Sequence, residues 1–289
     1  MPRRYLFGAF WFPRQTVEYG LTMDINLVRK LEGTTQRIQW KQTHWIPPAA
    51  FLLALLAWQL LAVYSGLPAF ILPSPLAVVE RFAQALGDGS LLRHTGVTLA
   101  EILLGLLTGT CSAILIGYAI AKSQTFERIA SPFLVASQAV PIVALAPLLV
   151  IWFGQGFFSK VLICALIVFF PVLVNTVVGL RAVPRSLNEL MRSLRASRWQ
   201  TLRHLEIPAA LPVFLGGLRI GATLSVIGAV VGEFVGADKG LGFLINVGRG
   251  QYDTALVFVA MFSLVALALV LYGVVLYLEY RLLAWQDKN

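Results

Sequence analysis

The sequence is poor in charged residues and in side chains that bind metals or form disulfides. Only 13% of its 289 residues are charged and 58% are hydrophobic, whereas ordinary soluble domains carry about 25% charged residues. The three histidines, His44, His94 and His204, lack metal-ligand spacing. Cys111 and Cys164 both lie inside apolar runs and form no CxxC pair. These shortages argue against a soluble domain, a metal site and a disulfide framework.

Catalytic and nucleotide-binding motifs are missing as well. The chain has no GxxxxGK[ST] phosphate-binding loop, no GxSxG nucleophile motif, and no haem or iron–sulfur spacing. We therefore predict that it is not an enzyme and has no catalytic residue, no metal and no cofactor.

What the sequence does contain is six long apolar runs. Each is close to the roughly 20 residues that cross about 30 Å of hydrocarbon. They lie at 46–64, 97–121, 131–153, 160–181, 209–235 and 255–280. We predict an all-α, polytopic membrane protein with six transmembrane helices. The third and fourth runs are separated only by residues 154–159, so they should form a tight hairpin.

The basic residues lie at the edges of these runs. The formal charge of +9 could indicate nucleic acid, but no aromatic-interleaved basic patch is present, so we predict no nucleic-acid binding. The positive-inside rule instead places both termini in the cytoplasm. Three parts follow: a cytoplasmic tail at 1–44, a six-helix transmembrane domain at 45–282, and a cytoplasmic tail at 283–289. Pro75 should start an amphipathic helix along the outer surface.

A few polar and small residues stand out inside the runs. Glu101, Arg219 and Glu233 are costly in a bilayer. We interpret Arg219 as a structural anchor, whereas Glu101 and Glu233 fit either an interfacial position or a functional role. Close approach of helices is expected at five glycines, namely Gly105, Gly109, Gly216, Gly217 and Gly221.

Residues 182–208, here called the basic loop, form a long polar stretch between two apolar runs. Ser186 with Glu189, and Ser197 with Gln200, each fit a capping box, so two short helices are expected. Apolar residues recur at helical spacing on both, namely Leu187, Leu190, Met191 and Leu194 on the first and Trp199, Leu202 and Leu205 on the second. Apolar faces on a polar loop predict a partner that covers them.

This loop resembles the EAA loop of the permease subunits of bacterial binding-protein-dependent ABC importers. The family pattern is Glu-Ala-Ala, three residues, Gly, nine residues, and Ile-x-Leu-Pro. Here Glu189-Leu190-Met191 takes the first place, Arg195 the glycine place, and Leu205-Glu206-Ile207-Pro208 the last. The resemblance covers about residues 66–282.

The resemblance implies a type I ABC importer permease fold in the bacterial inner membrane. It also implies four kinds of contact: the lipid bilayer, a second copy of the permease in a homodimer, cytoplasmic ATP-binding subunits, and an extracytoplasmic substrate-binding protein. The basic loop would form coupling helices that dock on the ATPase. The expected ATPase contacts are Glu189, Leu190, Met191, Leu194, Arg195, Ser197, Trp199 and Leu202.

Two departures from the family pattern change the loop. Leu190 and Met191 replace the two alanines and make the face bulkier. Arg195 replaces the glycine where the turn calls for a left-handed conformation, which costs a non-glycine residue about 1 kcal/mol.

Further motifs, among them Leu72-Pro73-Ser74-Pro75 and Trp152-Phe153-Gly154, resemble the branch that imports nitrate, sulfonates, taurine, thiamine-pyrimidine precursors and riboflavin. The runs 189–194 and 231–238 resemble its riboflavin and pyrimidine-precursor side, so one of these is the expected solute. Sulfonate, taurine or nitrate is the alternative within the same machinery. A proton-coupled secondary transporter, working through Glu101 or Glu233, is the alternative of another class.

Overall fold

The computed structural model describes residues 46–139 and 141–284. The predicted tail at 1–44 lies outside the described residues, as does nearly all of the predicted tail at 283–289. The chain divides into two units between Leu55 and Leu56. The first unit contributes only the opening turns of helix α2 (Ile46–Tyr64) to the described residues.

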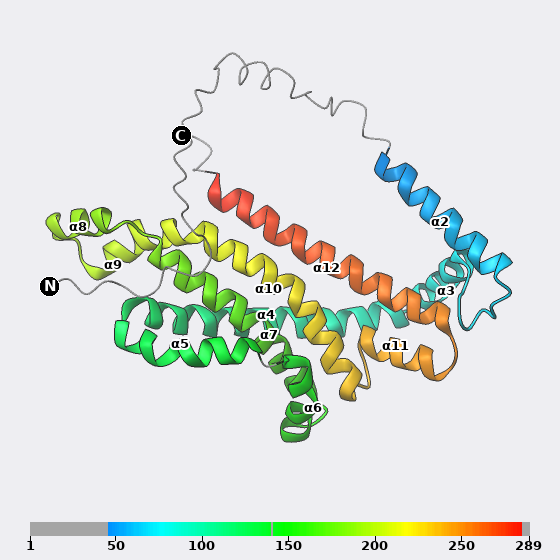
Figure 1. The fold of residues 1–289 in the computed structure, drawn as a ribbon. Helices are drawn as coiled ribbons and strands as arrows, with labels where there is room; N and C mark the ends of the chain where they lie inside the picture. The colour runs from blue at the N-terminus through cyan, green and yellow to red at the C-terminus, as the bar shows by residue number, and fades with distance from the viewer. Residues whose placement is uncertain (1–45, 140, 285–289) are drawn as a thin grey trace, which may run out of the picture. The chain divides into compact units, whose positions relative to one another are not determined.

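Every regular element in the described ranges is helical (Figure 1). The second unit continues α2 and then holds α3 (Pro75–Gly87), α4 (Ser90–Lys122), α5 (Gln124–Ala139), α6 (Ile142–Phe153), α7 (Phe157–Arg181), α8 (Arg185–Ser193), α9 (Arg198–Thr201), the π-helical turn η2 (Leu202–Glu206), α10 (Ile207–Gly236), α11 (Leu241–Gly250) and α12 (Thr254–Leu283). The predicted all-α class is confirmed.

Five helical runs in the described chain are long and apolar enough to cross a membrane: Pro47–Tyr64, Ser90–Lys122, Phe157–Arg181, Arg198–Gly236 and Thr254–Leu283. They coincide with five of the six predicted spans. The third predicted span, 131–153, is divided between α5 and α6 and is not one helix. Pro141 explains the break, because it has an extended backbone (ψ 104°) and carries no N–H to continue a helix.

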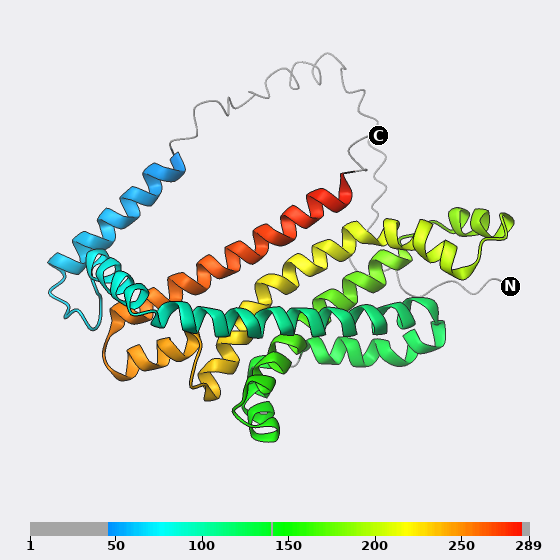
Figure 2. The same ribbon diagram turned by 180° about the vertical axis from the view of Figure 1, so that it is seen from behind.

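Helix α7 packs against both α4 and α10, as Figures 1 and 2 show from opposite sides. Glycines allow this close approach, because a Cβ atom on Gly105 would lie 2.2 Å from Cβ of Cys164, and one on Gly217 would lie 2.5 Å from Cβ of Asn175. Gly109 and Gly221 are also in tight contact with α7. The expectation is wrong for Gly216, which faces open space.

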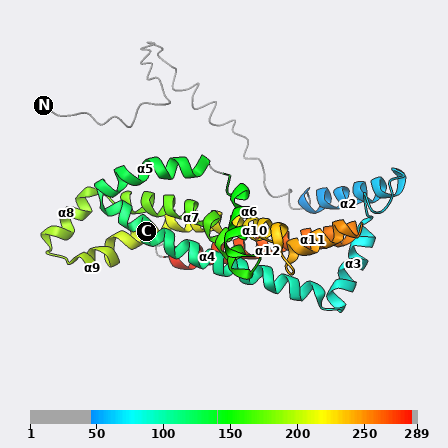
Figure 3. The same ribbon diagram turned by 90° about the horizontal axis from the view of Figure 1, so that it is seen from below.

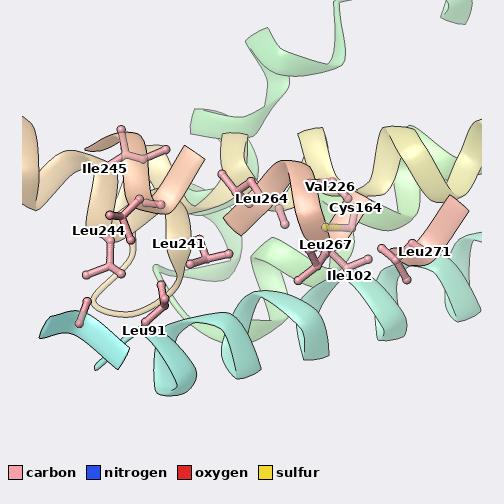
Figure 4. Close-up of a cluster of buried hydrophobic side chains, with 14 of the residues drawn as sticks. Leu91, Ile102, Cys164, Val226, Leu241, Leu244, Ile245, Leu264, Leu267 and Leu271 are labelled. Carbon is pink, nitrogen blue, oxygen red and sulfur yellow. The ribbon is translucent and has the colours of Figure 1, made fainter. Parts of the chain in front are cut away.

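A second buried region joins α4, α10, α11 and α12. Figure 4 shows Leu91 and Ile102 meeting leucines of α11 and α12, with Leu241 and Leu267 among them. Helix α11 was not expected from the sequence. Its start is marked by Gly240 at φ 114°, and the helix packs its apolar side on α12.

The predicted helix at Pro75 is confirmed as α3. The Ser74 hydroxyl accepts a hydrogen bond from the N–H of Ala77 at 3.2 Å, and Pro75 occupies the first turn. Its apolar face is only partly buried within this chain: Val78 and Ala85 are buried, whereas Leu76 and Val79 are exposed.

Candidate functional site

The first helix of the basic loop, α8, begins directly after Pro184. The carbonyl of Pro184 accepts hydrogen bonds from the N–H groups of Leu187 (3.2 Å) and Asn188 (3.4 Å). Ser186 therefore lies inside the first turn, and no side-chain cap is formed there. The predicted capping box of Ser186 and Glu189 is wrong, because the extended backbone at Pro184 sets the helix start two residues earlier than Ser186 would.

Helix α8 ends in a left-handed turn at Arg195, whose φ is 52°. The N–H of Ala196 donates to the carbonyl of Met191 at 3.0 Å, and the N–H of Arg195 donates to that of Arg192 at 2.9 Å. This is the hydrogen-bond pattern of a Schellman motif, in which glycine usually takes the left-handed place. The predicted left-handed conformation at Arg195 is confirmed.

The second capping box is confirmed. The Ser197 hydroxyl accepts from the N–H of Gln200 at 3.2 Å, and the Gln200 side-chain carbonyl accepts from the N–H of Ser197 at 2.7 Å. The helix that follows is not a separate one, since α9, η2 and α10 run on without a break. The N–H of Ile207 donates to the carbonyl of Leu202, five residues back. Pro208 next to it has no N–H to donate, which accounts for the wider turn.

Apolar side chains of the basic loop are exposed in this chain. Leu190, Leu194 and Trp199 are each more than half exposed. Of the eight predicted contact residues, six are exposed and two, Met191 and Leu202, are half-buried. Leu202 points away from that exposed set, because it lines an apolar pocket of about 350 Å³ between α4, α7 and α10. An exposed apolar cluster on a polar loop is typical of an interaction surface.

Two ion pairs flank the basic loop. Where the loop begins, Arg181 at the end of α7 pairs with Glu127 of α5. Where it ends, Glu206 of η2 pairs with Lys122 at the end of α4. Glu206 is only 5% exposed. The sequence predicts neither pair, because the partners lie 54 and 84 residues apart and no local spacing connects them.

At the opposite end of α4, three charged side chains are buried together. Glu101, Lys160 and Glu233 come from α4, α7 and α10, and each is at most 3% exposed. Lys160 Nζ lies 3.8 Å from Glu101 Oε1. Neither carboxylate oxygen of Glu101 makes a hydrogen bond within the described residues. Helix packing encloses both glutamate side chains, so neither Glu101 nor Glu233 reaches the surface of this chain.

Backbone N–H groups at the start of α11 close this buried cluster. The N–H groups of Gly240 and Leu241 donate to His94 Nδ1 (2.9 Å) and Thr98 Oγ1 (2.8 Å) of α4. The N–H of Gly242 donates to Glu233, which also accepts from the Thr98 hydroxyl at 2.6 Å. The first turn of α11 is therefore tied to α4 and α10 by a polar network. His94 and Thr98 were not predicted to take part, because neither departs from an ordinary helical pattern.

Arg219 lies in the middle of α10 and pairs with Glu279 of α12. Its guanidinium carbon is 5.6 Å from the ring centroid of Tyr272, also on α12. These contacts join two spans, in agreement with the structural anchor expected for Arg219.

Comparisons with known proteins show the family of this chain. Residues 109–284 match the family described as the binding-protein-dependent transport system inner membrane component. The chain is 46% identical to the riboflavin transport system permease protein RibX of Chloroflexus aurantiacus over 265 residues, which is 92% of this chain and 98% of RibX. It is 38% identical to the formylaminopyrimidine transport permease protein ThiX of Halalkalibacterium halodurans, over 84% of this chain and 96% of ThiX.

A solved structure shares the fold. A chain of the MetNI methionine ABC transporter, in an inward-facing conformation, superposes with a TM-score of 0.59 at 18% identity, covering 67% of this chain and 96% of that one. The fold, the length of the family match and the identity to two permeases lead to one conclusion. The chain belongs to the family of binding-protein-dependent transport system inner membrane components and is a permease of an ABC importer.

Proposed function

We propose that this permease forms the path by which an ATP-driven importer takes up riboflavin or a thiamine-pyrimidine precursor. The main support for this proposal is the 46% identity to the riboflavin permease RibX over 92% of the chain. Identity falls to 31% for the taurine permease TauC of Escherichia coli, over 86% of the chain. This gradient favours a heteroaromatic solute over a sulfonate.

The pairing of Arg219 supports the same choice. Sulfonate, taurine and nitrate carry an anionic group, and a path for them gains from a cation that is free to attract it. Arg219 lies in the middle of the span formed by α10, and its charge is already balanced by Glu279. A flat solute without a permanent anionic group needs no such cation.

The basic loop is the proposed docking site for the cytoplasmic ATPase subunits. Its exposed side chains Leu190, Leu194 and Trp199 can enter a groove on a partner, and the Schellman turn at Arg195 fixes the angle between α8 and α9. Bulky Leu190 and Met191 would fill a larger groove than two alanines would. Both termini then lie in the cytoplasm, in keeping with the positive-inside rule.

The complete importer contains this permease paired with a second copy, two ATPase subunits and an extracytoplasmic binding protein that delivers the solute. Closure of the ATPase subunits moves the basic loops, and the helices alternate between inward-facing and outward-facing states. This chain supplies no catalytic group, since ATP hydrolysis occurs on the ATPase.

Docking is tested by co-purifying the chain with its ATPase after Leu190→Asp and Leu194→Asp. Both changes place a carboxylate in a contact that should be apolar, so ATPase recovery should drop at least tenfold, which corresponds to about 1.4 kcal/mol. Ser186→Asp is the matched control, because it adds the same charge to α8 without removing an apolar contact. Undiminished recovery with both Leu variants would exclude the loop as the docking site.

The solute is tested with the assembled importer in proteoliposomes. ATP-dependent accumulation of fluorescent riboflavin, or of a labelled aminopyrimidine, is expected, with no accumulation of labelled taurine. Taurine uptake without riboflavin or pyrimidine uptake would assign the chain to the sulfonate side. Liposomes that hold the permease alone, under an imposed proton gradient, provide the second control. Uptake there would favour a secondary transporter that uses Glu101 or Glu233.

A further inference from the structure

The α4–α5 corner contacts both ends of the basic loop. The corner consists of the end of α4, the single residue Ser123, and the start of α5. It lies at the same end of the helices as α8 and α9 (Figures 1 and 3). Lys122 on one side of Ser123 pairs with Glu206, and Glu127 on the other side pairs with Arg181.

The corner contributes the cation to one ion pair and the anion to the other. The corner offers a cation to the outgoing end of the loop and an anion to the incoming end. An exchange of partners would bring Lys122 against Arg181 and Glu127 against Glu206, and like charges repel. The charges therefore define which side of the corner meets which end of the loop.

Hydrogen bonds around Ser123 hold the backbone of the corner. The N–H of Ser123 donates to the carbonyl of Ile120 at 3.4 Å, and the Ser123 carbonyl accepts from the N–H of Glu127 at 2.9 Å. The Ser123 hydroxyl accepts from the N–H of Phe126 at 3.2 Å. Arg181 also donates to the carbonyl of Ile120 at 3.3 Å, so it contacts α4 as well as α5.

Helix α4 extends from this corner to the buried cluster at α11. Its 33 residues span about 50 Å at roughly 1.5 Å per residue. At its far end, Thr98 and His94 accept hydrogen bonds from the N–H groups that begin α11. A displacement of the corner along the helix axis would therefore reach the first turn of α11.

We propose that α4 transmits movement of the basic loop to the first turn of α11. At one end of α4, Lys122 pairs with Glu206, and Arg181 donates to the Ile120 carbonyl while it pairs with Glu127 of α5. At the other end, Thr98 and His94 tie α4 to the start of α11. This inference rests on the proposed function, because it takes the basic loop as the part that the ATPase moves. Lys122, Glu127, Arg181 and Glu206 are positioning residues and contact neither solute nor nucleotide in this account.

The test uses charge reversal in the complete importer. Lys122→Glu and Glu206→Lys are made singly and together, as are Glu127→Arg and Arg181→Glu. Each single reversal should lower the number of solutes imported per ATP by about threefold to tenfold, with ATPase recovery unchanged. Each double reversal should restore most of the number of solutes imported per ATP, here called the transport ratio. Glu80→Arg, a charge reversal at an exposed position on α3, is the matched control and should leave the transport ratio unchanged.

A second readout follows the far end of α4. Arg249 is exposed on α11. The thiol of Arg249→Cys can therefore be labelled with a membrane-impermeant reagent, and the extent of labelling is compared with and without trapped ATP. The ATP-dependent change in labelling should disappear with Lys122→Glu and return in the double reversal. If a reversal prevents folding, Glu206→Gln and Glu127→Gln remove the charge while keeping the shape of the side chain. The same loss of import per ATP and of the ATP-dependent labelling change is then expected.

Four results would overturn the inference. Double reversals that are no better than single ones would show that the pairs do not act as pairs. Single reversals that leave both the transport ratio and the labelling change intact would show that α4 transmits nothing. Loss of ATPase recovery with the single reversals would assign the pairs to docking, and the proposed function would stand. Failure of the unaltered chain to recover any ATPase would instead remove the proposed function and, with it, this inference.

Discussion

A Cβ atom on Gly105 would lie 2.2 Å from the Cβ atom of Cys164, so α4 and α7 approach more closely than any other residue at position 105 would allow. Gly105→Val should destabilise the protein by about 1–3 kcal/mol, because the added side chain forces the two helices apart. Thermal unfolding in detergent measures the effect. Gly96→Ala, on the same helix with open space around it, should be neutral or slightly stabilising. Equal effects of the two changes would contradict this packing.

Arg195→Gly should stabilise the turn between α8 and α9. Arg195 has a left-handed backbone, and glycine adopts that conformation without the cost of about 1 kcal/mol borne by other residues. Hydrogen exchange of the Ala196 N–H, which bonds to Met191, should slow. Arg192→Gly, inside α8, is the control and should speed exchange, because glycine weakens a helix interior. Faster exchange in Arg195→Gly would refute the strain at this turn.

Gly240→Ala should release the start of α11. Gly240 has φ 114°, and a Cβ there would lie 2.2 Å from the carboxyl carbon of Glu233. Both the strain and the clash disfavour alanine, by about 1–3 kcal/mol together. Gly250→Ala at the other end of α11 meets no atom within 4 Å and serves as control. Protease sensitivity of the segment between α10 and α11 should rise only in Gly240→Ala.

The Arg181–Glu127 pair should be independent of pH across the physiological range. The hydrogen bond from Arg181 holds the pKa of Glu127 below its usual value, and the charge of Arg128 acts in the same direction. A carboxylate with a lowered pKa contributes stability that is fully present above the ordinary pKa, about 4.3, and is lost as the pH falls through the lowered one. The difference in import per ATP between the unaltered chain and Glu127→Gln should therefore stay constant from about pH 8 to about pH 5. A difference that vanishes between pH 7 and pH 6 would contradict the lowered pKa.

Much of the fold follows from local patterns in the sequence. Apolar runs of membrane length predict six spans, and five of these are single long helices in the described chain. Ser74-Pro75, and Ser197 with Gln200, mark helix starts that the structure confirms. Such signals act over a few residues, so a single sequence contains them. Pro141 divides the third run in the structure, although the high hydrophobicity on both sides of it favours one continuous span in the sequence.

The parts that could not be predicted depend on contacts between distant segments. Nothing near Lys122 indicates Glu206, and nothing near Glu101 indicates that Lys160 and Glu233 meet it in a buried cluster. At Ser186 a local motif predicts a helix start that the structure does not have. The backbone conformation of Pro184 starts the helix two residues earlier. The basic loop itself was identified because its helical spacing, its turn and its family pattern coincide.

Site-directed cross-linking from the basic loop tests the central claim most directly. Cys111 is exposed and is first changed to serine, whereas Cys164 is buried and can remain. A photoreactive probe on Leu194→Cys, with Ile129→Cys on α5 as an exposed apolar control, is then applied to membranes that contain the whole importer. We predict that the probe at position 194 cross-links to the ATPase subunit and that trapping with ATP changes the yield, with little cross-linking from position 129. Cross-linking to lipid alone from position 194, in an importer that hydrolyses ATP and transports its solute, would contradict the account.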